Sequence, residues 1–180
     1  GKYIFSFVHD KDVARVEDIT PLPKGLRATL AAEGYFISQL KTVETFRDPD
    51  GTVKFLFELG DGHRIESVLL VTDTQRQTLC ISSQAGCRMG CDICATGQLR
   101  FKRDLTAGEI ADQVNQAERA AGKINNVVYM GMGEPFDNYN EVMRSLHILN
   151  HHTGKNIGQR HITVSTCGLC EGIERFACER

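Results

Sequence analysis

Residues 80–97 read CISSQAGCRMGCDICATG and bring Cys87, Cys91 and Cys94 together on one short segment. Their spacing is C-x3-C-x2-C, and the glycines in the segment let the backbone wrap around a bulky ligand. Thiolates are soft ligands that select zinc or an iron–sulfur cluster. Three thiolates on a four-iron cluster leave one iron open, whereas a structural zinc site needs a fourth ligand from elsewhere. The segment therefore predicts a 4Fe-4S cluster bound by these cysteines, with a structural zinc module as the alternative.

The overall composition narrows the class of protein. The chain has seven cysteines, an odd number, whereas a secreted disulfide framework usually has an even number in a shorter chain. The formal net charge of -2 argues against nucleic-acid binding by bulk charge alone, although it leaves room for a local basic patch. No apolar run approaches the roughly 20 residues of a membrane span. We therefore expect a cytoplasmic protein without a membrane partner.

Residues 1–76 are expected to form a small α+β accessory domain. The expected elements are a helical segment over 1–35 that ends near Gly34, a hairpin over 42–46 and 53–57, and a third strand over 65–71. The turn of the hairpin is Asp-Pro-Asp-Gly, a sequence with strong turn preference. A polar link at residues 72–77 marks the boundary with the next domain.

Residues 77–180 follow a repeated order of strand, loop and helix. The expected strands are 79–82, 127–130 and 161–165, and the expected helices follow Thr106, cover 138–151 and begin near Gly172. Thr106-Ala-Gly-Glu109 has the form of a capping box that opens the first of these helices. Three β/α units imply parallel strands with right-handed crossovers, and they are too few to close a barrel. We therefore expect an α/β fold with an incomplete (β/α) barrel and interpret the chain as a fragment.

Two further motifs accompany the cysteine segment: YMGMGEP at residues 129–135 and TVST at residues 163–166. Together with the SSQ-x-GC sequence before Cys87, they resemble the RlmN/Cfr family of radical S-adenosylmethionine RNA methyltransferases. The cysteine triplet alone would indicate the radical S-adenosylmethionine superfamily and no more. The resemblance implies a partial radical-SAM barrel, formed by the first three β/α units and preceded by an accessory domain. It also implies a 4Fe-4S cluster and S-adenosylmethionine as cofactors.

The resemblance assigns roles to individual residues. It implies that Gly133 and Glu134 bind the amino group of S-adenosylmethionine and that Ser165 is a further cofactor contact. It also implies that Cys80 is a catalytic thiol that resolves a covalent enzyme–RNA intermediate and that Glu66 is a proton acceptor. Without the resemblance, Cys80 is an ordinary buried strand cysteine and Glu66 a solvent-facing strand residue.

The chain departs from the family pattern at several positions. Ile93 stands where the family usually has an aromatic residue, and Arg100 and Asp104 replace a glycine and an asparagine of the loop after the cluster. The basic run RFKR at residues 100–103 is interpreted either as a phosphate contact near the mouth of the barrel or as a solvated loop.

Three further cysteines have no place in the family pattern. Cys167 and Cys170 form a C-x2-C pair, which would need Cys178 and His161 to complete a second metal site. Free thiols are the favoured interpretation. The family's methyl-carrying cysteine lies beyond residue 180, so Cys178 is not assigned that role, and we expect residues 1–180 alone to be inactive.

The resemblance implies methylation of an adenine ring carbon. Carbon 2 of an adenine in 23S rRNA is the expected target for an RlmN-like enzyme, with tRNA as a further substrate, and carbon 8 is the Cfr-like alternative. A flavodoxin or ferredoxin is the expected electron donor. A radical S-adenosylmethionine enzyme with a non-RNA substrate remains a further alternative.

Overall fold

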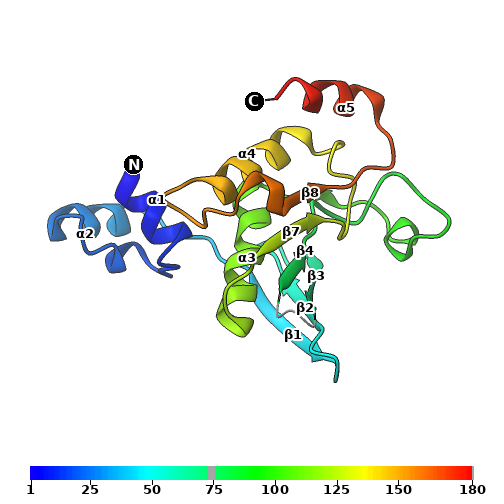
Figure 1. The fold of residues 1–180 in the computed structure, drawn as a ribbon. Helices are drawn as coiled ribbons and strands as arrows, with labels where there is room; N and C mark the ends of the chain where they lie inside the picture. Colours follow the sequence, from blue (N-terminus) through cyan, green and yellow to red (C-terminus); the bar gives the residue numbers. More distant parts are fainter. Residues whose placement is uncertain (73–75, 180) are drawn as a thin grey trace.

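The computed structural model describes residues 1–72 and 76–179, and a six-stranded mixed sheet is its central element (Figure 1). The strand order is β1-β2-β3-β4-β7-β8. These strands are β1 (Lys41–Arg47), β2 (Val53–Glu58), β3 (Arg64–Val71), β4 (Gln77–Cys80), β7 (Asn126–Tyr129) and β8 (Ile162–Val164). A separate two-stranded sheet pairs β5 (Gln84–Ala85) with β6 (Arg103–Asp104).

The first four strands of the large sheet are antiparallel neighbours. The hairpin predicted from the sequence is confirmed as β1 and β2, and the third strand as β3. Gly51 closes the first turn with a φ of 89°, a backbone conformation that glycine adopts without steric cost. Alternate residues of β2, Val53, Phe55 and Phe57, are buried, so one face of this half of the sheet packs into the core.

The last three strands, β4, β7 and β8, are parallel neighbours. Helix α3 (Ala107–Ala121) connects the first two and α4 (Tyr139–Asn150) connects the second two, as the β/α pattern predicts. The capping box is confirmed, because Thr106 accepts from the Glu109 backbone and the Glu109 side chain accepts from the Thr106 backbone. This cap satisfies amide groups that would otherwise be unpaired at the start of α3.

Two predicted boundaries at the C-terminal end were wrong. The short 3-10 helix η3 (Gln159–His161) occupies the predicted start of the last strand, so β8 begins at Ile162. The last helix, α5 (Cys170–Ala177), begins two residues before Gly172. Gly172 is needed there for packing, because a Cβ at this position would lie 2.5 Å from Cβ of Phe136.

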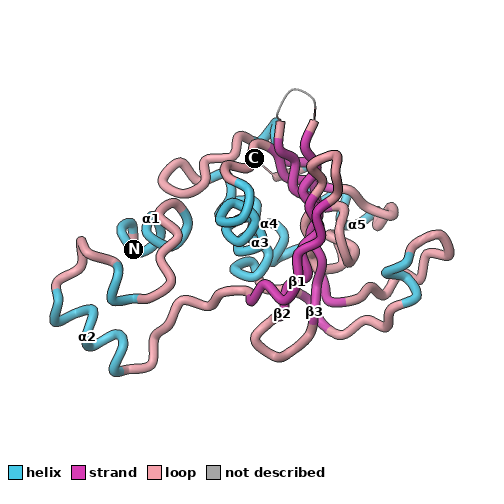
Figure 2. Tube along the Cα trace, turned by 90° about the horizontal axis from the view of Figure 1, so that it is seen from below, coloured by secondary structure: helices cyan, strands magenta, loops and turns pink. Residues whose placement is uncertain are grey.

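The N-terminal helical segment is less regular than predicted. It consists of α1 (Lys2–His9), the 3-10 helix η1 (Val16–Asp18) and α2 (Lys24–Ala32), with loops between them. Gly34 follows α2 with a φ of 82°, as expected for a residue beyond a helix end. Figure 2 shows these helices on the far side of α3 from the sheet, where they form an outer layer.

The sheet continues across the predicted domain boundary at residues 76 and 77. Strand β3 pairs with β4 through four residue pairs, including Val68 with Cys80 and Leu69 with Leu79. The division into residues 1–76 and 77–180 stays a prediction, and residues 73–75 of the polar link lie outside the described residues.

The core lies between the sheet and helices α3 and α4. Leu79 and Val127 from the sheet and Ile110, Val114 and Leu149 from the helices are all completely buried. Burial of each such side chain stabilises the fold by about 1.5–3 kcal/mol. Within the described ranges, no helix combines the length and apolar character that a membrane crossing requires.

Candidate functional site

The face of the sheet opposite α3 and α4 carries the two predicted catalytic residues. Leu79 is buried against the helices, so its neighbour Cys80 points to the other face. Cys80 pairs with Val68, and Glu66 stands two residues before Val68 on the same face of β3. The register of the sheet therefore brings Glu66 and Cys80 to one surface, at the end of β4 where the cysteine segment begins.

Cys80 is a half-buried thiol in contact with the strand beside it. Its pairing partner in the parallel ladder is Val128, and the backbone amide of Met130 donates a hydrogen bond to the thiol. Burial raises the pKa of Cys80, and the hydrogen bond from Met130 opposes that shift in part. In this environment Cys80 is a protonated thiol at neutral pH.

Glu66 forms an ion pair that the sequence did not predict. The Nζ of Lys54 lies 2.7 Å from a carboxylate oxygen of Glu66, and both side chains are a little less than half exposed. Lys54 comes from β2, where it also faces away from the buried side of the strand. The ammonium group holds the Glu66 carboxylate over the same face that carries Cys80.

The three predicted cluster ligands lie on the loop between β5 and β6. Cys91 and Cys94 are exposed and Cys87 is partly exposed. Figure 2 shows this loop, which includes the 3-10 helix η2 (Ala95–Gln98), on the opposite side of the sheet from α3. Among the residues that the structure describes, no three cysteine, histidine or acidic side chains are already close enough to hold a metal ion.

The loop nevertheless has features that fit a cluster. The Cys94 amide donates to the Cys91 carbonyl over 3.1 Å, and the Gly97 amide donates to the Cys94 carbonyl over 2.9 Å, which places the two thiols on consecutive tight turns. The Met89 amide lies 3.5 Å from Sγ of Cys87 and donates to it. A Cβ on Gly97 would lie 2.6 Å from the Cys91 carbonyl oxygen, so glycine is required for this turn. Amide donors and soft thiolates suit an iron–sulfur cluster.

The turn after β7 packs closely against the strand end of β4. A Cβ on Gly131 would lie 2.7 Å from the Ile81 carbonyl, and one on Gly133 would lie 2.5 Å from Cβ of Gln84. Gly133 also has a φ of 99°, which is unfavourable for other residues. The glycines of this motif are therefore required first for the contact between two chain segments.

Glu134 is buried and already has hydrogen-bond partners. One carboxylate oxygen accepts from the Phe136 amide over 2.9 Å, and the other accepts from the Cys167 amide over 2.8 Å. The carboxylate thus connects the turn after β7 to the segment after β8. Each carboxylate oxygen can accept a second hydrogen bond, so an ammonium group can still be recognised here.

Ser165 and Cys167 follow directly after β8. Ser165 is partly exposed and stands two residues after Thr163, whose neighbour in the sheet is Val128. Cys167 is exposed as a residue, but partial desolvation of its thiol and its hydrogen bond with the Glu134 carboxylate raise its pKa to about 11. All seven cysteines are free thiols. His161, which was considered for a second metal site, shares a hydrogen bond of 2.8 Å with Asn126 through its Nδ1 atom.

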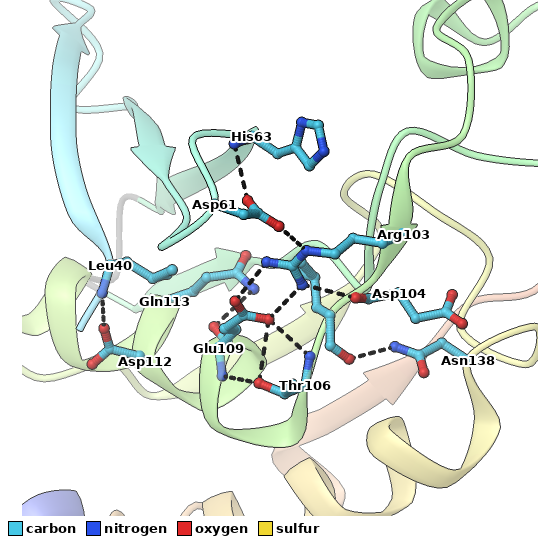
Figure 3. A network of polar contacts seen from close by, with 11 residues as sticks. Leu40, Asp61, His63, Arg103, Asp104, Thr106, Glu109, Asp112, Gln113 and Asn138 are labelled. Carbon is cyan, nitrogen blue, oxygen red and sulfur yellow. Dashed lines mark hydrogen bonds and ion pairs between the residues drawn. The ribbon is translucent and has the colours of Figure 1, made fainter. Parts of the chain in front are cut away.

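One residue of the basic run at residues 100–103 has a structural role. Arg103 forms hydrogen bonds of 2.8 and 2.9 Å with Glu109 at the start of α3, and it also pairs with Asp61 in the turn between β2 and β3 (Figure 3). The hydrogen bond from Arg103 lowers the pKa of the Asp61 carboxyl, which also accepts a hydrogen bond from the His63 amide. Arg103 therefore anchors the end of the cysteine loop, whereas Arg100 and Lys102 are exposed.

Sequence reasoning missed the buried polar residues that support the site. Gln84 is completely buried, accepts from the Glu134 amide over 2.9 Å, and donates to Asp104 and Asp137 over 2.8 and 2.7 Å. Ser82 donates to the Glu66 carbonyl over 2.6 Å and accepts from the Met132 amide over 2.9 Å. The signal was the polar run SSQ directly after a buried strand, because buried polar groups need partners.

The chain is similar to several known proteins. Residues 81–177 match the family described as the Radical SAM superfamily. Two similar curated proteins, from Lysinibacillus sphaericus and Bacillus subtilis, are both named "Probable dual-specificity RNA methyltransferase RlmN". The first is 44% identical over 98% of this chain and 47% of its own length. The second is 45% identical over 97% of this chain and 48% of its own length.

A solved structure is also similar over nearly the whole chain. It is described as the crystal structure of a radical SAM methyltransferase from Sphaerobacter thermophilus, with a TM-score of 0.87 and 42% sequence identity. The match covers 99% of this chain and 53% of that one, so the chain spans about half the length of the relatives that it matches. The predicted α/β fold class is confirmed, and membership of this superfamily implies a 4Fe-4S cluster and S-adenosylmethionine as cofactors. The chain belongs to the radical SAM superfamily, and the resemblance to its RlmN/Cfr RNA methyltransferases is confirmed.

Proposed function

We propose that the full-length protein methylates carbon 2 of an adenine in 23S rRNA, with tRNA as a second substrate. The main observation behind this proposal is that Cys80 and Glu66 lie on one face of the sheet. They lie near the end of the sheet where the chain leaves β4 towards the cysteine loop and leaves β7 towards the Glu134 turn. In α/β barrels and open α/β sheets, ligands bind at the carboxyl ends of the strands. The name of the curated relatives, an RNA methyltransferase, supports RNA as the substrate.

Cys87, Cys91 and Cys94 would hold the cluster, and Gly133, Glu134 and Ser165 would bind S-adenosylmethionine. When bound, a reduced 4Fe-4S cluster supplies the electron that cleaves this cofactor. The protein contributes position: Glu134 is fixed by two backbone amides, so an ammonium group meets an oriented carboxylate without a reorganisation cost.

Cys80 and Glu66 are assigned to the steps on the base. Glu66 accepts the proton that leaves the adenine carbon, and the ion pair with Lys54 orients its carboxylate. Cys80 is the thiol that releases the methylated base: it forms a disulfide with the family's methyl-carrying cysteine, the bond from that cysteine to the methyl carbon breaks, and this carbon takes up a proton. Its pKa is raised, so it is protonated in the resting protein and needs a base to become a nucleophile.

The cellular setting follows from the same proposal. Reductive cleavage requires one electron at low potential, and a flavodoxin or ferredoxin is the donor that we propose. Folded RNA substrates and oxygen-sensitive thiols are consistent with a cytoplasmic enzyme.

The test is reconstitution of the full-length protein without oxygen, followed by reaction with a 23S rRNA fragment and mass mapping of the methyl group. We expect methylation at carbon 2 and loss of product when Cys80 is replaced by alanine. Methylation at carbon 8 alone would favour the Cfr-like alternative. Formation of 5′-deoxyadenosine without RNA methylation would favour a non-RNA substrate.

A further inference from the structure

Arg88, between the first two proposed cluster ligands, connects the cysteine loop to the rest of the site. Its guanidinium carbon lies 3.4 Å from the centre of the Phe101 ring. Its Nη1 lies 2.5 Å from a carboxylate oxygen of Asp137 and 3.8 Å from one of Asp104. Arg88 therefore contacts the far end of the same loop and the segment that follows the turn after β7.

The contacts of Arg88 continue into the buried network. Gln84 donates to the same oxygen of Asp137 that pairs with Arg88, and it also donates to Asp104. The amide oxygen of Gln84 accepts from the Glu134 backbone. A chain of hydrogen bonds thus runs from the residue next to Cys87 to the proposed ligand of the cofactor's amino group.

We propose that Arg88 is a positioning residue that holds the cysteine loop against the turn carrying Glu134. This rests on the proposed cluster site. The loop itself is exposed and has few other links to the body of the protein, so a fixed point next to Cys87 reduces the chain entropy that is lost when three thiols converge on a cluster.

A guanidinium suits this position better than an ammonium. It can stack on Phe101 with its planar face and donate to Asp137 at its edge, whereas lysine can do one of these at a time. A simple exposed ion pair contributes little, but the stacked ring and the two carboxylates act together on one side chain.

The experiment uses the full-length protein with Arg88→Met, Arg88→Lys and Asp137→Asn, each reconstituted without oxygen. Iron and sulfide per chain, the rate of cluster loss to a chelator, and the dissociation constant of S-adenosylmethionine are measured. Arg144→Met is the matched control, because Arg144 pairs with Glu141 three residues away on the exposed surface of α4.

We expect Arg88→Met to accelerate cluster loss by about tenfold, the scale of one charge-assisted hydrogen bond, while the melting temperature of the apoprotein stays unchanged. Arg88→Lys should lose its cluster more slowly than Arg88→Met, and Asp137→Asn should lose its cluster faster than the wild type. Wild-type resistance to the chelator in Arg88→Met and Asp137→Asn would overturn the proposal. If Arg88→Met also lowers the melting temperature, the rates of cluster loss in Arg88→Lys and Asp137→Asn test the proposal in its place. Failure of the wild type to bind a cluster would instead overturn the proposed function.

Discussion

The cysteine loop and the turn after β7 are built in opposite ways. Cys91 and Cys94 on the loop are exposed, and Ile93 between them is fully exposed. In the turn, Met132 and Glu134 are buried, and both carboxylate oxygens of Glu134 accept hydrogen bonds from the backbone. Buried contacts within the protein therefore hold the turn, whereas the tip of the cysteine loop is exposed.

This difference indicates how the two halves of the site acquire their structure. Folding of the chain around the sheet fixes the turn, because the turn is hydrogen-bonded to residues 81–83 after β4, to Gln84 of β5 and to the segment after β8. If the loop holds the proposed cluster, it takes its final arrangement when the thiolates bind metal, and binding free energy becomes folding free energy there. The first two predictions below should each affect one region and spare the other.

Replacement of a cluster ligand should give the largest effect. In the full-length protein, Cys91→Ala should bind less than about a tenth of the wild-type iron, because the two remaining thiolates, Cys87 and Cys94, hold a four-iron cluster poorly. Iron and sulfide analysis after reconstitution measures this. Cys170→Ala is the matched control, because Cys170 is also an exposed thiol outside the loop. Equal iron loss in both variants would contradict the assignment.

The turn should respond to a single methyl group. Gly133→Ala introduces a Cβ 2.5 Å from Gln84 at a φ of 99°, so we expect a loss of about 2–4 kcal/mol in unfolding free energy from strain and overpacking. Gly90→Ala in the loop is the control, because its φ is 63° but no atom lies within 4 Å of a new Cβ. Its cost should be about 1–2 kcal/mol, from backbone strain alone. Chemical denaturation of both variants provides the measurement, and equal losses would show that the turn is not tightly packed.

The thiol of Cys80 should react more slowly than the thiols of the loop. Burial raises its pKa above the usual value of 9.0, so the reactive thiolate becomes abundant only at higher pH. Alkylation of the apoprotein with iodoacetamide at pH 8 should be about tenfold slower at Cys80 than at exposed Cys94, and it should keep rising above pH 9. Peptide mass spectrometry gives both rates. A plateau for Cys80 below pH 9 would refute the expected shift.

Acidification should change a region remote from both parts of the site. Burial and nearby Lys155 lower the pKa of His9 from 6.5 to about 4, so between these values the unfolded chain binds a proton that the folded chain does not. The free energy that burial of the neutral His9 side chain contributes to folding is therefore fully present above pH 6.5 and is lost as the pH falls towards 4. The protection factors of the α1 amides, which correct for the intrinsic exchange rate at each pH, should fall over this window, and His9→Phe should abolish the fall. Persistence of the fall in His9→Phe would assign it to another group.

The sequence predicted the order of the strands of the large sheet and of helices α3, α4 and α5, because each had a local signal, whereas β5 and β6 were not predicted. The capping box of α3 and the turn residues of the β1–β2 hairpin are short-range features, and both are confirmed. The cysteine spacing likewise predicted a soft-metal site without knowledge of the fold. The predicted boundary at residue 76 had a local signal as well, but β3 pairs with β4 across it.

Contacts between residues that are far apart in the chain could not be predicted from the sequence. Nothing in the order of residues indicates that Lys54 pairs with Glu66 or that Gln84 connects Asp104, Asp137 and Glu134, because these contacts depend on strand register and on loops that meet in space. The partners of Arg103 were not predicted for the same reason, since Asp61 and Glu109 come from two other segments.

Electron paramagnetic resonance of the reduced full-length protein tests the central claim most directly. If three cysteines leave one iron open and the turn after β7 receives the cofactor, addition of S-adenosylmethionine should change the cluster signal. The change should require an intact Glu134 turn and disappear in Gly133→Ala. A cluster signal that stays the same with saturating S-adenosylmethionine would contradict the claim.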